Sequence, residues 1–247
     1  MCQHLFVTGP ARSGTSLMLM LMHYIKRCKV YDQHEYDPLR LQEVERIAKE
    51  MKTEDARHYA TKQPFGFWEE WGEYNFQYLF DHGAKIICMM RDPRDVAVSH
   101  NPHSPGERYF WRDYSWIRTA QEILKHKDSH THDLLVVKYE DLVTDTLTQM
   151  HRVASFVGEA LLPGYEKFYE HPSVNAKFSN DVSAKRLRGK RVWATLGGWH
   201  TKKAARPISA DRIGLWKAEE HQEHLKTAIT DQVRNLAQRL GYNIAEE

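Results

Sequence analysis

The 247-residue chain is poor in cysteine and in net charge, and it has no long apolar run. Three widely spaced cysteines, Cys2, Cys28 and Cys88, form neither a metal-binding pattern nor a disulfide framework, which favours a reducing, intracellular setting. A formal net charge of +2 argues against a broad nucleic-acid or membrane-binding surface. The longest apolar run, Leu17 to Met22, is too short to cross a bilayer, and residues 1–4 lack the pattern of a signal peptide. We therefore expect a cytoplasmic protein whose anion sites come from local basic clusters.

Short apolar stretches alternate with helical patterns along most of the chain. Strands are expected at 5–8, 29–31 and 85–90 and at the start of 134–142, and helices at 14–27, 38–52, 68–82, 144–157 and along the apolar stripe from 225 to 240. This alternation predicts an α/β fold with three layers, in which helices cover both faces of a central parallel sheet. Residues 170–211 are polar, basic and aromatic without a clear period, which is typical of a substrate loop or lid. A single domain, 1–247, accounts for the whole sequence.

The stretch VTGPARSGTS, residues 7–16, joins the first expected strand to the first expected helix. A strand, a glycine turn and a helix N-terminus together direct backbone N–H groups and the helix dipole at an anion. A nucleotide-triphosphate loop has lysine before its final Ser or Thr, and here that position is Thr15. Arg12 supplies the compensating charge, and its guanidinium suits phosphate or sulfate oxygens. A purely structural glycine turn is the alternative.

A second polar stretch, RDPRDVAVSH, follows the strand at 85–90. Ligands of open α/β sheets bind at the carboxyl ends of the strands, so Arg91 and Arg12 are expected to converge on one anionic ligand. Ser99 lies about two helical turns beyond Arg91 and could add a hydroxyl group. A salt-bridged helix cap is the alternative for this stretch.

Four segments together resemble those of the sulfotransferases, which use 3′-phosphoadenosine 5′-phosphosulfate (PAPS). They are GPARSGTSLM, RDPRDVAVSH, VVKYEDL and DRIGLWK, and they occur in the family's order from residue 9 to residue 217. The resemblance implies the P-loop-like fold of that family. Arg12 stands where the cytosolic phenol and steroid enzymes usually have lysine, so the chain is more similar to bacterial, carbohydrate and tyrosylprotein sulfotransferases.

The resemblance implies a PAPS site with three parts. The first loop would hold the 5′-phosphosulfate through Gly9, Arg12, Ser13, Gly14, Thr15 and Ser16. Arg91 and Ser99 match the pair that grips the 3′-phosphate, to which Arg212 and Gly214 would add. Tyr139 matches a position near the adenine, with a buried tyrosine at a strand end as the alternative. No metal is required if Arg12 and Lys62 neutralise the leaving phosphate. Lys62 resembles the lysine of a Lys-x-Pro element, and a solvated loop lysine is the competing interpretation.

The general base is the least defined part of this site. In tyrosylprotein sulfotransferases a glutamate about twenty residues after the loop arginine serves, and the matching region here is VYDQHEYDP. Glu35 is the first candidate, and Asp32, Asp37 and His34 lie in the same stretch. Cytosolic members use a histidine from another segment, which leaves His100 and His103 open.

The acceptor is expected to be a hydroxyl group of a sugar, a phenol or another small metabolite. Its pocket would be lined by residues 65–71, 109–116 and 193–200, where aromatic side chains mix with basic ones. No nucleic-acid or membrane partner is expected, and a homodimer is left open. Two other functions compete with this prediction: a P-loop kinase or NTPase, which would need the missing lysine, and a non-catalytic relative that binds PAPS without transfer.

Overall fold

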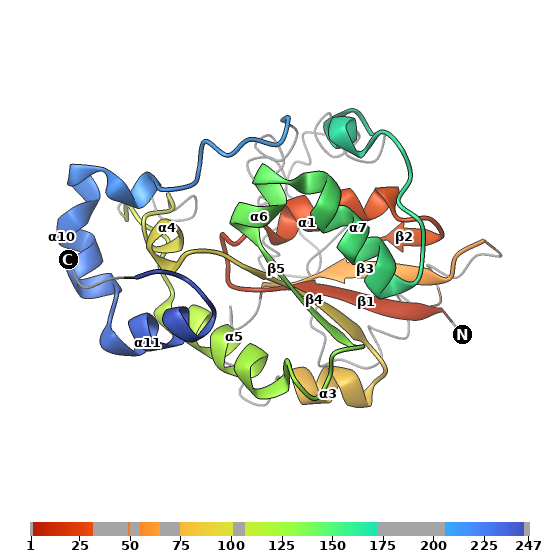
Figure 1. The fold of residues 1–247 in the computed structure, drawn as a ribbon, viewed down its shortest axis with the longest axis horizontal. Coiled ribbons are helices and arrows are strands. Elements are labelled where there is room, and N and C mark those ends of the chain that lie inside the picture. The colour runs from red at the N-terminus through yellow and green to blue at the C-terminus, as the bar shows by residue number, and fades with distance from the viewer. Residues whose placement is uncertain are drawn as a thin grey trace, which may run out of the picture.

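The computed structural model describes residues 2–31, 49, 55–64, 75–100, 107–171 and 206–244. At the centre of the described chain lies a five-stranded sheet in which every pair of neighbours is parallel (Figure 1). The strands are β1 (Gln3–Thr8), β2 (Cys28–Val30), β3 (His58–Lys62), β4 (Lys85–Met90) and β5 (Leu134–Lys138), in the order β2-β3-β1-β4-β5. This arrangement confirms the predicted α/β class with a central parallel sheet.

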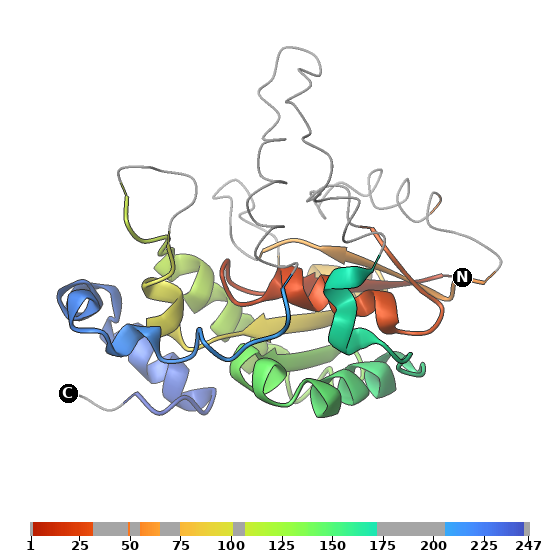
Figure 2. The same ribbon diagram turned by 90° about the horizontal axis from the view of Figure 1, so that it is seen from above.

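Helices cover both faces of the sheet, and the alternation of side chains along β1 separates two cores (Figure 2). Leu5 and Val7 belong to the core with α1 (Thr15–Leu21), α6 (Tyr139–Thr144) and α7 (Thr146–Val157). Phe6 belongs to the other core, whose helices are α3 (Phe76–Asp81), α4 (Pro93–Ala97), α5 (Asp113–His126), α10 (Glu219–Ala228) and α11 (Asp231–Arg239). Because the strands are parallel, their carboxyl ends, and the loops that follow them, lie at one edge of the sheet.

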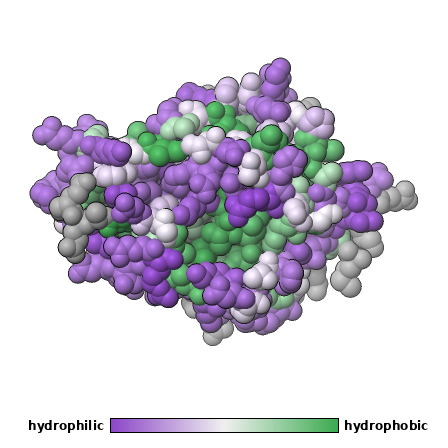
Figure 3. All heavy atoms as spheres, viewed as in Figure 1, coloured by the Kyte–Doolittle hydropathy of each residue, from purple (hydrophilic) through white to green (hydrophobic). Residues whose placement is uncertain are grey.

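The edge strand β5 leaves apolar side chains partly accessible. Leu135 and Val136 are intermediate in burial, whereas Leu134 and Val137 are buried. The face in Figure 3 accordingly shows an apolar area near its centre, where β5 runs, within a largely hydrophilic surface. In the described part of the chain, no helix is long and apolar enough to cross a membrane.

Two elements, the strand β3 and the helix α5, were not predicted. β3 has the sequence HYATK, whose polar residues do not give the apolar pattern of a buried strand. Four of its five residues are nevertheless buried. Polar side chains in this interior have hydrogen-bond partners: the buried His4 on β1 and Thr61 on β3 hydrogen-bond to each other at 2.8 Å. α5 was also missed, because its buried face mixes Trp116 and Ile123 with small residues such as Ser115.

Several predicted boundaries were wrong. The first helix ends at Leu21 and continues only as a turn of 3₁₀ helix, η1 (Met22–Tyr24), rather than reaching residue 27. In the 134–142 stretch the strand lies at the start, as predicted, and ends at Lys138, but the helix α6, which begins at Tyr139, was not predicted. The stripe from 225 to 240 belongs to two helices, because Thr230 caps α11 by accepting the N–H of Val233.

Other predictions were confirmed or fall outside the described residues. The helix at 144–157 begins at Thr146 and ends, as expected, at Gly158, which has a left-handed φ of 74°. Of the helix expected at 68–82, the structure describes α3, whereas nearly all of the helix expected at 38–52 lies outside the described residues. Residues 172–205 of the expected lid also lie outside them.

Candidate anion-binding site

The loop between β1 and α1 has a backbone that only glycine adopts easily at two positions. Gly9 has φ 138° and Gly14 has φ 92°. A Cβ atom at Gly9 would overlap the carbonyl group of Met89, and one at Gly14 would lie 2.7 Å from the Tyr139 ring. Both glycines are therefore needed for the loop to lie against β4 and α6. This backbone presents the N-terminus of α1 at the carboxyl edge of the sheet.

Arg12, Arg91 and Arg212 come together beside this loop. The Arg91 side chain is 4% exposed and lies between two backbone segments: its Nη1 donates to the Arg12 carbonyl oxygen at 3.2 Å, and its Nη2 donates to the Arg212 carbonyl oxygen. Burial, together with the charges of Arg91 and Arg212, lowers the pKa of Arg12 to about 10. Arg12 still carries its charge at neutral pH, so the cluster is a concentrated positive site.

The cluster also contains an unused donor. Within the described chain, the buried Nε of Arg91 has no hydrogen-bond partner. Buried donors in native structures are nearly always paired, so an anion that accepts from this group fits the site. The Arg91 guanidinium lies 4.6 Å from the centre of the Tyr139 ring, a cation–π contact that leaves the Arg91 Nε available to a ligand.

Lys62 reaches the loop from the neighbouring strand. It ends β3, which pairs with β1 in a register that puts Lys62 opposite Val7. Its Nζ donates to Ser16 Oγ at 3.3 Å, so Lys62 lies at the helix end of the loop. The sequence alone left open whether Lys62 was a solvated loop residue, and the structure places it on a strand beside the loop.

Two predicted serines have side chains that are engaged within the protein. Ser13 is fully buried, and its Oγ donates to the Pro10 carbonyl oxygen at 2.6 Å, which stabilises the loop. Ser99 follows α4 rather than lying within a two-turn helix, and its Oγ donates to the Asp95 carbonyl oxygen at 2.9 Å. Thr15 is also buried, at 5% exposure.

Asp95 and Glu140 are two acidic residues at the site to which the sequence assigned no function. Asp95 is 1% exposed, and its carboxylate accepts the backbone N–H groups of Gly214 at 2.8 Å and Trp216 at 3.2 Å. Glu140, directly after Tyr139, accepts the N–H of Asp92 at 2.9 Å and so ties the end of β5 to the end of β4. Burial is the main cause that raises the pKa of both carboxyl groups. The signal in the sequence for Asp95 was its place in the RDPRD stretch, which directly follows the apolar run at 85–90.

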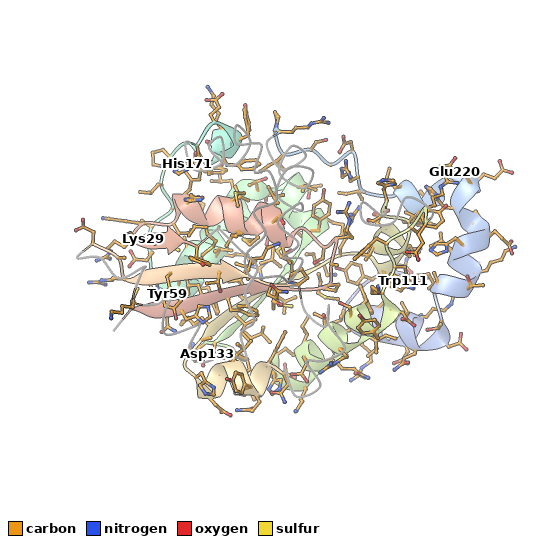
Figure 4. All side chains as sticks on the ribbon, turned by 180° about the vertical axis from the view of Figure 1, so that it is seen from behind. Lys29, Tyr59, Trp111, Asp133, His171 and Glu220 are labelled. Atoms are coloured by element: carbon orange, nitrogen blue, oxygen red, sulfur yellow. The ribbon has the colours of Figure 1, made fainter. Side chains whose placement is uncertain are left out.

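The expected acceptor pocket is described only in part. Trp116 is fully buried and its Nε1 donates to the Arg91 carbonyl oxygen at 3.1 Å, so it belongs to the core instead of a pocket wall. Tyr109 stacks on His224 with ring centres 4.2 Å apart, which joins this segment to α10. Figure 4 shows Trp111 and Glu220 at the same end of the molecule. Residues 65–71 and 193–200 lie outside the described chain.

The structure does not place the candidates for the general base. Glu35, Asp32, Asp37, His34 and His103 all lie outside the described residues. His100 is described and exposed, and it forms an isolated antiparallel bridge with Tyr109. The assignment of Glu35 therefore stays a prediction.

Comparisons with known structures find the same fold. A sulfotransferase domain from the Synechococcus PCC 7002 olefin synthase superposes with a TM-score of 0.56 at 16% identity, over 99% of this chain and 96% of that one. Mouse sulfotransferase SULT7A1, in complex with PAP, gives 0.55 at 17% identity, over 96% and 89%. A sulfotransferase from Alicyclobacillus acidocaldarius gives 0.54 at 12%, over 99% and 98%. At these identities the likeness establishes the fold.

Sequence comparisons establish the family. Sulfotransferase 2A6 from Rattus norvegicus is 29% identical over 102 residues, which are 34% of this chain and 35% of the rat protein. The match thus spans only about a third of that relative's length. The family model described as "Sulfotransferase domain" matches residues 3–241. That match covers the loop after β1, the RDPRD stretch after β4, β3 with Lys62 and the turn around Gly214, and the chain therefore belongs to the sulfotransferase domain family.

Proposed function

We propose that the protein transfers a sulfuryl group from PAPS to a hydroxyl group of a sugar, a phenol or another small metabolite. The observation that carries the proposal is the convergence of Arg12, Arg91 and Arg212 at the carboxyl edge of the sheet. A nucleotide with phosphate groups at both its 5′ and 3′ ends needs cations at each end, and the cluster draws them from separate segments: Arg12 from the loop after β1, Arg91 from the end of β4, and Arg212 from near the C-terminus. The bound PAP named for the mouse relative agrees with such a ligand.

The chain offers groups for each end of that nucleotide. The loop N–H groups and the N-terminus of α1, with Arg12 and Ser16, would hold the 5′ end. Arg91, Ser99 and the turn with Arg212 and Gly214 would hold the 3′-phosphate. Tyr139, which packs against Gly14 and Arg91, would border the adenine.

PAPS, when bound, supplies an activated sulfuryl group whose leaving group is a phosphate. Catalysis of such a transfer rests mainly on alignment and on the stabilisation of charge. Arg12 is part of the loop, where its backbone has a left-handed φ of 74°, and Lys62 Nζ contacts Ser16 Oγ. These two cations would neutralise the charge that develops on the leaving phosphate oxygen, so the chemistry requires no metal.

Glu35 is our candidate for the base that removes the proton of the acceptor hydroxyl. We expect Glu35→Gln to remove turnover, because the amide cannot take up the proton, while the affinity for adenosine 3′,5′-bisphosphate stays the same. Rates with PAPS and calorimetry with the bisphosphate measure the two effects. Full activity of the variant would assign the base to another residue, among which Asp32, His34, His100 and His103 come first.

Calorimetry with three ligands tests the function itself. We expect tight binding of adenosine 3′,5′-bisphosphate and of PAPS, and weak binding of ATP, because the loop has Thr15 in place of the triphosphate lysine. Tight ATP binding without bisphosphate binding would refute the proposal in favour of a kinase or NTPase. A mass-spectrometric screen with labelled PAPS over phenols, sugars, lipids and peptides would then identify the acceptor. Binding of PAPS without transfer to any of them would point to a non-catalytic relative.

The organisation around this site is also part of the proposal. We treat residues 1–247 as one catalytic domain, in which residues 170–211 form a lid over the acceptor. The protein would act in the cytoplasm.

A further inference from the structure

Residues 206–217 form a strap that joins the two cores at the carboxyl edge of the sheet. Ile208 packs against the core that contains α1, and Trp216 packs against the core that contains α5. In Figure 1 the strap runs toward α4 and α10. In the sequence, Arg212 lies between Ile208 and Trp216, the two apolar residues by which the strap contacts the cores. The position of Arg212 therefore depends on what holds the strap.

Asp95 is the charged side chain that holds the end of this strap. Its Oδ2 accepts the N–H of Gly214 at 2.8 Å, and its Oδ1 accepts the N–H of Trp216 at 3.2 Å. Both bonds are charge-assisted and shielded from water, since Asp95 is 1% exposed. Arg94, its neighbour in the sequence, stacks on the Trp216 ring at 3.8 Å and supports the same contact.

The strap in turn completes the arginine cluster. Arg212 lies two residues before Gly214, and its carbonyl oxygen accepts from Arg91 Nη2. Asp95 itself lies 3.8 Å from that nitrogen. One carboxylate thus fixes the spacing between Arg91, which follows β4, and Arg212, which comes from 121 residues further along the chain.

We propose that Asp95 is a positioning residue for recognition of the 3′-phosphate: it holds the strap so that Arg212 stays beside Arg91. This inference rests on the proposed PAPS site. Asp95 does not touch the nucleotide in this account and acts only through the strap. Its effect is therefore confined to ligands with a 3′-phosphate, because the 5′ end is held by the loop after β1.

Electrostatics alone predict the opposite sign. Removal of a negative charge 3.8 Å from Arg91 leaves the cluster more positive, which by itself strengthens anion binding. Asp95→Asn also replaces one carboxylate oxygen by an NH₂ group that faces a backbone N–H, so at least one strap bond is lost. The positioning role thus predicts weaker binding, whereas a charge effect predicts tighter binding.

The test compares Asp95→Asn with Glu140→Gln. Glu140 is a half-buried carboxylate that also interacts electrostatically with Arg91, but it accepts its hydrogen bond from the Asp92 N–H and not from the strap. Calorimetry measures binding of adenosine 3′,5′-bisphosphate and of adenosine 5′-phosphate. We expect Asp95→Asn to weaken bisphosphate binding about tenfold or more, as for the loss of a charge-assisted hydrogen bond, with 5′-phosphate binding unchanged. Glu140→Gln should leave both affinities within about threefold.

Hydrogen exchange of the free protein separates this inference from the proposed function. The Gly214 and Trp216 amides should exchange about tenfold or more faster in Asp95→Asn than in the wild type, with or without any ligand. If the wild type does not bind the bisphosphate, the proposed function fails while the exchange result still reports on the strap. If the wild type binds it and Asp95→Asn binds equally or more tightly, the positioning role is wrong. Asp95→Glu keeps the charge but displaces the carboxylate, and it gives the same test should the Asn variant not fold. If Asp95→Glu loses the preference for the bisphosphate over adenosine 5′-phosphate, the positioning role is supported. If it keeps that preference, the role is wrong.

Discussion

Gly14→Ala tests whether the loop geometry is set by the close approach of Tyr139. Gly14 has φ 92°, and a Cβ atom there would lie 2.7 Å from Tyr139 Cδ2. Gly158 offers a matched control, because its φ is 74° and nothing lies within 4 Å of its added Cβ. Alanine at both positions carries the cost of the left-handed conformation, about 1–2 kcal/mol.

Only Gly14→Ala adds a steric term. The contact is about 1 Å closer than the usual carbon–carbon separation of ~3.5–4.0 Å, so the Tyr139 ring must move. Overpacking of this kind costs about 1–3 kcal/mol. In the wild type the Tyr139 ring centre lies 4.6 Å from the Arg91 guanidinium, and a displaced ring would lose this contact. We therefore expect Gly14→Ala to lose about 2–5 kcal/mol of unfolding free energy and Gly158→Ala about 1–2.

Urea unfolding measures the stabilities, and calorimetry measures the affinity for adenosine 3′,5′-bisphosphate. The affinity should fall for Gly14→Ala and stay the same for Gly158→Ala. The double variant Gly14→Ala with Tyr139→Leu should recover part of the lost stability, because the smaller side chain makes room for the methyl group. Equal losses for the two glycine variants, or no coupling in the double variant, would refute the steric account.

Three further variants test single residues. Arg91→Ala should weaken bisphosphate binding about 10–100-fold by calorimetry and leave adenosine 5′-phosphate binding unchanged; unchanged bisphosphate affinity would contradict its role. Lys62→Ala should slow transfer about 100-fold or more in PAPS assays, with bisphosphate affinity within about threefold; a loss in affinity alone would make Lys62 a binding residue. Burial lowers the pKa of His4 to about 3, so its contribution to stability is full above the ordinary pKa of 6.5 and is lost as pH falls below it. Between pH 7 and pH 5 the wild type should lose about 2 kcal/mol more than His4→Gln in urea unfolding, and parallel losses would contradict the burial of a neutral His4.

The sequence was most informative where the chain signals its structure locally. The apolar run of β4 predicts a buried strand on its own, and the glycines of the first loop indicate a backbone that other residues do not adopt. β3 was not predicted, because His58 and Thr61 are polar residues that lie in the interior. Their burial depends on partners from other parts of the chain.

The sequence by itself determined the parallel α/β class, the loop without a triphosphate lysine, and the identity of Arg12, Arg91, Arg212 and Lys62 as its candidate cations. Only the tertiary structure decided that these residues meet. Arg91 binds carbonyl groups 79 and 121 residues away, and Lys62 reaches Ser16 only because β3 lies beside β1. The role of Asp95 also needed the fold, since its two partners lie at the far end of the chain. The physical reason is that hydrophobic periodicity and turn chemistry act within a few residues, whereas the spacing of the charges follows from strand order and from the packing of both cores.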